Sequence, residues 1–91
     1  MKNNLELHKQ INFDDLVKHG IENGANIVDG MPWSWKINNN PVTHENNTTY
    51  LIETMDGQKV FEKGNILIAY ESGLKVFEKS HIDTHYPVLF T

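Results

Sequence analysis

Two tryptophans, Trp33 and Trp35, are the residues of this chain best suited to recognising a ligand. They are two positions apart, so on a β-strand their indoles would share one face. Two indoles on one face can form a platform on which a nucleobase stacks, or an anchor for a protein partner. The alternative is that at least one of them packs beneath a helix, because a core this small needs large side chains.

The segment after the tryptophans supplies hydrogen-bonding groups: an imidazole, a carboxylate and several amides. Such groups can read the edge of a nucleobase or a ribose hydroxyl. They are equally typical of a solvated loop in which asparagines form turns. The candidate ligand-binding residues are therefore Trp33, Trp35, Lys36, His44, Glu45 and Asn46.

Catalytic signatures are absent from the sequence. It contains no nucleophile elbow, no glycine-rich phosphate loop and no cysteine. His81 and His85 have the i, i+4 spacing of metal ligands on a helix, but no third ligand follows at a recognisable distance. We therefore predict a protein that is not an enzyme and has no catalytic residue, no cofactor and no metal site; a small hydrolase is the alternative.

The size and charge of the chain limit its architecture and its partners. Its 91 residues predict a single domain, 1–91. A chain of this length buries only about 60–65% of its unfolded surface, and oligomerisation often makes up the shortfall, so we expect a homo-oligomer. The net charge is −4 and the eight lysines are scattered. This argues against binding duplex nucleic acid, which depends on a basic face that neutralises phosphates.

No segment predicts export or insertion into a membrane. The absence of cysteine excludes a disulfide scaffold and a thiolate zinc site, and it fits a reducing cytoplasm. The first ten residues lack the apolar stretch of a signal peptide. The longest apolar run, residues 66–70, is far too short to span a bilayer.

One helix is predicted near the N-terminus, within residues 12–24. Asn12 is a good N-cap, apolar side chains follow it at helical spacing, and Gly24 is a natural residue just past the C-terminus. We expect the helix itself to span residues 13–23. Gly20 weakens it by about 1 kcal/mol relative to alanine but can allow close packing on a sheet. Residues 1–11 are either a tail or an edge strand.

The rest of the chain, 25–91, predicts antiparallel strands. Residues 25–28 and 31–37 flank a strong turn dipeptide, Asp29-Gly30. Residues 38–47 are polar, rich in asparagine and contain Pro41, so we expect a loop there. Residues 48–54 predict a strand, Asp56-Gly57 a second turn, and residues 85–90 a last strand on an edge, because they contain Pro87.

An internal repeat leads to the prediction for the sheet. Residues 57–66 recur as residues 73–82, with seven of ten positions identical. Each copy contains a turn glycine and a short Lys-Val-Phe strand, which is typical of a β-meander in which residues 59–61, 66–70 and 75–77 pair in succession. The predicted fold class is α+β: one N-terminal helix packed on an antiparallel meander of about five or six strands, a sheet that can curl toward a small barrel.

Three segments together resemble a known group of proteins. GMPWSW at 30–35, PVTHEN at 41–46 and YLIET at 50–54 are similar to a block in small uncharacterised accessory proteins of tailed phages and prophages. The resemblance covers roughly residues 25–88. It departs at Asn65, where an acid is usual, and at Val76-Phe77, where Tyr-Pro is expected. It implies a phage-encoded protein of the host bacterial cytoplasm and brings no active site with it.

The resemblance leads to a hypothesis for the function, because small phage accessory proteins are often antagonists of host defence. The leading hypothesis is a counter-defence protein that sequesters a nucleotide-like immune signal, with Trp33 and Trp35 stacking on bases and the polar candidates supplying hydrogen bonds. The first alternative is an inhibitor that binds a host protein through a surface anchored by tryptophan. The second is a structural or replication-associated phage protein.

Overall fold

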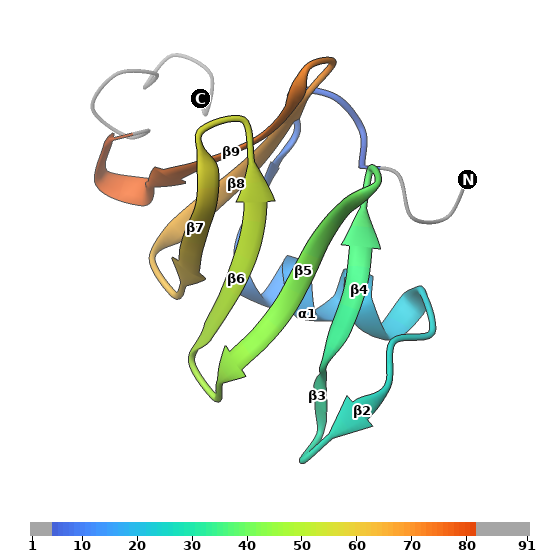
Figure 1. Ribbon diagram of the computed structural model, residues 1–91. Coiled ribbons are helices and arrows are strands. Elements are labelled where there is room, and N and C mark those ends of the chain that lie inside the picture. The colour runs from blue at the N-terminus through green and yellow to red at the C-terminus, as the bar shows by residue number, and fades with distance from the viewer. Residues whose placement is uncertain (1–4, 82–91) are drawn as a thin grey trace.

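The computed structural model describes residues 5–81, which form one main helix and nine short antiparallel strands in three sheets (Figure 1). The predicted last strand and His85 lie outside the described residues. Strands β4 to β7 form a four-stranded sheet in sequential order, β2 and β3 form a hairpin, and β8 lies between β1 and β9. The elements are β1 Gln10–Ile11, α1 Phe13–Glu22, β2 Ile27–Val28, β3 Met31–Pro32, β4 Ser34–Ile37, β5 Asn40–Asn46, β6 Thr49–Thr54, β7 Gly57–Glu62, β8 Asn65–Tyr70 and β9 Gly73–Glu78.

The helix forms where the sequence predicts it, because both of its ends carry local signals. The Asn12 side chain accepts a hydrogen bond from the Asp15 backbone N–H at 2.9 Å. The Asp15 carboxylate in turn accepts one from the Asn12 N–H at 3.2 Å, which completes a capping box. The helix ends at Glu22, and Gly24 follows with a φ of +77°, a conformation that favours glycine.

The four-stranded sheet has one face toward the helix and one toward solvent. Alternate side chains of its strands are buried, and the cross-strand row formed by Trp35, Val42 and Ile52 belongs to the buried face. The neighbouring row, Ser34, Thr43, Leu51 and Val60, lies on the outer face and is largely exposed. This alternation fits an antiparallel sheet that is covered on one side.

The predicted single meander is wrong, because the chain changes sheets between β7 and β8. Among the described residues β7 pairs only with β6, whereas β8 pairs with β1 and β9. β7, the last strand of the four-stranded sheet, ends at Glu62, whose backbone N–H donates to the Asn65 side chain at 3.0 Å. Four successive residues of β8, Ile66 to Ala69, are buried, so this strand needs cover on both faces and lies at the centre of its own sheet. Within residues 5–81 the ladders do not close into a barrel.

The predicted loop at residues 38–47 is also wrong, since most of it is β5, an interior strand of the sheet. Asn38 and Asn39 both have positive φ angles, +49° and +69°, as the two central residues of a tight hairpin turn require. Pro41 is tolerated because it pairs with Lys36 on β4 at a position beyond the β5–β6 ladder, which begins at Val42.

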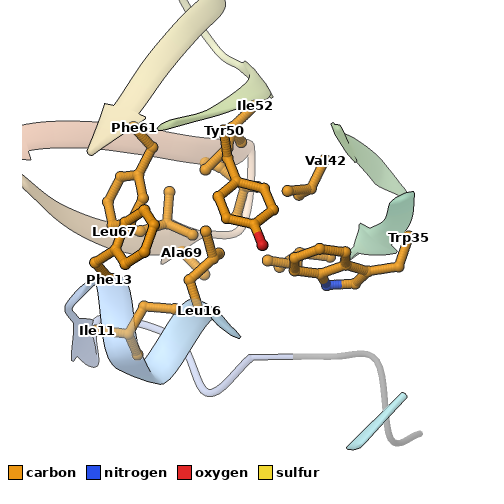
Figure 2. Close-up of a cluster of buried hydrophobic side chains, with 12 residues drawn as sticks. Ile11, Phe13, Leu16, Trp35, Val42, Tyr50, Ile52, Phe61, Leu67 and Ala69 are labelled. Carbon is orange, nitrogen blue, oxygen red and sulfur yellow. The ribbon is translucent and has the colours of Figure 1, made fainter. Parts of the chain in front are cut away.

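The hydrophobic core lies between α1 and the inner faces of the two larger sheets. Figure 2 shows Phe13 and Leu16 projecting from α1 toward Tyr50 and Phe61 of the four-stranded sheet. Phe13 stacks on Phe61 with ring centroids 6.2 Å apart. The buried members of the cluster are Ile11, Phe13, Leu16, Trp35, Ile37, Val42, Tyr50, Ile52, Phe61, Leu67, Ala69 and Leu74.

Gly20 is the point at which the helix meets the strands most closely. A β-carbon at this position would lie 2.7 Å from the Pro32 Cβ and 2.8 Å from two ring carbons of Trp35. The expected close packing at Gly20 is therefore present. The absence of a side chain there lets α1 rest directly on the indole.

Replacing Gly20 with alanine is expected to lower the free energy of unfolding by about 1–3 kcal/mol, because the added methyl group overpacks the contact. The sign is opposite to the gain of about 1 kcal/mol that helix propensity alone would give. Urea unfolding followed by circular dichroism measures the difference. Lys18→Ala on the exposed side of the helix is the control and should stay within about 0.5 kcal/mol of the native protein. A stabilised Gly20→Ala variant would contradict the packing described.

Candidate binding surface

Trp33 joins the β2–β3 hairpin to the four-stranded sheet. Its N–H donates to the Asn26 carbonyl at 2.8 Å, and its carbonyl accepts from the His44 N–H at 2.7 Å. The residue therefore continues both ladders and has a fixed backbone. Its side chain is 41% exposed. An aromatic side chain on a rigid backbone loses little conformational entropy when a partner covers it, which suits it to be an anchor.

Trp35 is a core residue and not part of a binding face. It is only 9% exposed, and its indole N–H donates to His19 Nδ1 at 3.0 Å. Its ring meets the edge of the Tyr50 ring at a centroid distance of 5.5 Å (Figure 2). The two indoles therefore do not form an exposed platform, and the alternative that at least one tryptophan packs under the helix is the one observed.

His44 lies directly behind Trp33. The two rings are 4.7 Å apart, and the edge of His44 meets Tyr50 at 5.2 Å. The His44 side chain is 8% exposed, and neither ring nitrogen has a hydrogen-bond partner within residues 5–81. A buried polar group without a partner costs roughly 1–3 kcal/mol. In the described part of the chain, an unsatisfied imidazole thus lies immediately beneath the half-exposed Trp33.

The other three candidates do not join this pair. Lys36 is exposed and alternates with the buried Trp35, so it lies on the opposite face of β4. Glu45 accepts a hydrogen bond from the Thr49 hydroxyl at 3.2 Å. The Asn46 side-chain oxygen, Oδ1, accepts from both the backbone N–H and the hydroxyl of Thr48 at 2.9 Å, which stabilises the β5–β6 turn. Glu45 and Asn46 are therefore engaged locally.

Apolar side chains next to Trp33 were not predicted as site residues. Ile21 at the end of α1 and Ile27 and Val28 in β2 are all exposed. Figure 1 shows the β2–β3 hairpin projecting beyond the end of the four-stranded sheet, beside the last turn of α1. We call these three residues together with Trp33 the Trp33 surface. The sequence does contain a signal for this exposure. Two aliphatic residues in a two-residue strand of a short hairpin have too few neighbours to be covered.

The Tyr50 hydroxyl stabilises the base of this hairpin. It donates to the Pro32 carbonyl at 2.8 Å, from a ring that is fully buried. Burial raises the pKa of Tyr50 to about 12, because the charged phenolate would be desolvated. The hydroxyl therefore keeps its proton at neutral pH and acts as a structural donor.

Within residues 5–81 no three His, Asp or Glu side chains come together as metal ligands would, and no helix there has the length and apolarity that crossing a bilayer requires. The chain matches no protein-family model, no curated protein sequence and no solved structure.

Proposed function

We propose that this chain is a non-enzymatic protein that docks on a partner protein through the Trp33 surface. The observation that carries the proposal is an exposed, rigidly held indole, with further exposed aliphatic side chains in the adjoining β2 strand and at the end of α1. Contiguous exposed apolar side chains are uncommon on small soluble proteins and usually mark interaction sites. In the phage setting that the resemblance implies, the partner is a host defence protein and the effect is inhibition.

The surroundings of the Trp33 surface suggest the chemistry of the partner. Glu22 follows Ile21 directly, and Asp29 follows Val28 directly, and both carboxylates are exposed. Exposed apolar side chains with neighbouring carboxylates are complementary to an apolar pocket that is bordered by lysine or arginine. The partner would receive the Trp33 indole in that pocket and its basic rim would face the two carboxylates.

Sequestration of a nucleotide-like signal is the second candidate. It is favoured by the exposed face of Trp33, on which one base could stack. Two features weaken it: Trp35 is buried, which leaves one stacking face, and Lys36 lies across the sheet from His44. A phosphate-bearing ligand would find no nearby cation among the candidate residues, so docking on a protein is better supported.

Affinity capture with the tagged chain from a lysate of phage-infected bacteria tests the proposal. We expect the native protein to retain one partner protein in stoichiometric amount and Trp33→Ala to lose it. Val60→Ala, which removes an exposed apolar side chain on the outer face of β7, is the matched control and should retain the partner. A nucleotide released from the native protein on denaturation, with no protein retained, would favour sequestration instead. Equal retention by native protein and Trp33→Ala would exclude this surface.

A further inference from the structure

A second candidate site lies at the opposite end of β4 from Trp33. It is an open cavity of about 470 Å³, within the range of roughly 300–1,000 Å³ that is usual for small-molecule sites. Three segments distant in the sequence meet there: residues 5–7, the β4–β5 turn and the β8–β9 turn, which Figure 1 shows at the same end of the molecule. The lining residues are Leu5, Leu7, Asn38, Asn39, Asn40, Tyr70, Glu71, Ser72 and Gly73.

Three consecutive amides give this cavity its polar wall. The Asn38 side-chain oxygen accepts the Leu5 N–H at 2.7 Å, which fixes the N-terminal segment as one side of the cavity. The Asn40 side-chain nitrogen donates to the Asn38 carbonyl at 2.9 Å. These bonds use one end of each amide. Within residues 5–81 no further hydrogen bond involves the Asn38 side-chain nitrogen, the Asn40 side-chain oxygen or either end of the Asn39 side-chain amide. These donors and acceptors remain available to a ligand.

The charge of the lining limits the class of ligand. Of the described residues that line the cavity, Glu71 is the only charged one, and none is lysine, arginine or histidine. A phosphate or carboxylate group would therefore meet a carboxylate and no cation. The other lining residues are two leucines, Tyr70, Ser72 and Gly73, of which the leucines and the Tyr70 ring form an apolar wall. The cavity combines an apolar wall with amide and carboxylate groups that bind hydroxyls, and this combination suits an uncharged, polyhydroxylated ring.

We propose that this cavity binds a small neutral saccharide, independently of the Trp33 surface. The apolar wall contacts the C–H face of the sugar ring, as aromatic and aliphatic side chains do in small-molecule sites. The Asn39 amide and the Glu71 carboxylate bind its hydroxyls: the carboxylate accepts from them, and the amide both donates and accepts. Two residues at the tips of different hairpins then recognise the same ligand.

Chemical-shift perturbation of the isotope-labelled chain tests this inference, with glucose, galactose, mannose and N-acetylglucosamine as probes. We expect at least one of these sugars to shift the backbone amides of residues 38–40 and 70–73. Asn39→Gly should weaken that binding about tenfold or more, since losing hydrogen bonds worth about 1.5 kcal/mol has that effect. Glycine accepts the positive φ of this position, so the turn is preserved while the amide is removed.

Two further variants and two further probes make the result decisive. Glu71→Gln should weaken sugar binding, whereas Glu53→Gln, the same change on the exposed face of β6, should not. The inference is overturned if none of the four sugars shifts these amides, or if Asn39→Gly binds as well as the native protein. It is also overturned if inorganic phosphate or putrescine, and no sugar, perturbs the cavity.

Discussion

Replacing Trp35 with alanine is expected to lower the free energy of unfolding by about 3–5 kcal/mol, the usual cost of truncating a large buried aromatic side chain. Small domains are stable by only about 5–15 kcal/mol in total, so the variant should lose a large fraction of its stability. Besides leaving a cavity in the core, the substitution removes two specific contacts. His19 Nδ1 loses the indole donor, and Gly20 loses the ring on which the helix rests.

Urea unfolding followed by circular dichroism measures this effect, with Trp33→Ala as the matched control. Both variants remove one indole from the same stretch of chain, but only Trp35 is buried. Trp33→Ala should change stability by less than about 1 kcal/mol, because the lost packing is offset when water reaches the ring nitrogens of His44. If the two variants were equally stable, the assignment of one tryptophan to the core and the other to the surface would be wrong.

The helix could be predicted from the sequence because its signals are local. Asn12 and Gly24 mark its ends by the hydrogen bonds and the backbone angle that each provides, and neither depends on the rest of the fold. The Asp29-Gly30 hairpin was predicted for the same reason. Asn38-Asn39 is a comparable signal for a hairpin turn, since asparagine tolerates positive φ. Pro41 favours a loop over a strand, and for that reason the sequence did not predict β5.

The sheet arrangement could not be predicted, because the pairing of a strand depends on distant residues. The two copies of the repeat show the difficulty most directly. In β7, Phe61 is fully buried in the main core while Val60 is exposed. In β9, Val76 packs against the main core, and Phe77 instead packs with Ile66 and Ile68 on the other face. The same Lys-Val-Phe-Glu sequence is therefore used in opposite orientations, which only the surrounding sheets determine.

The Trp33 surface keeps one of the two tryptophans of the predicted site and differs from the prediction in its other members. The spacing of the tryptophans says nothing about where the covering helix ends. Gly20 brings α1 onto Trp35, and the helix stops two residues later at Glu22, so Trp33 stays beyond its reach. The exposure of Ile21 and of the β2 residues follows from the same geometry, because no described element extends over them.

Replacing Trp33 with alanine is expected to weaken binding of the partner protein by about 30-fold or more, which corresponds to a hot-spot loss of at least about 2 kcal/mol. The reason is that the indole is the largest side chain of the Trp33 surface, and its backbone is already fixed by hydrogen bonds to Asn26 and His44. Calorimetric titration of the captured partner with each variant measures the change.

The buried Trp35 also permits a direct optical test of the same contact. Trp35→Phe leaves Trp33 as the only tryptophan, so its fluorescence reports the environment of the Trp33 surface alone. Partner binding should shift this emission to shorter wavelength, because the indole loses its contact with water. Val60→Ala in the same background should leave the shift unchanged, since Val60 lies on the outer face of β7. An emission that stays constant while the partner binds would mean that the partner contacts a different surface, and Trp33 would then be exposed for no reason connected with binding.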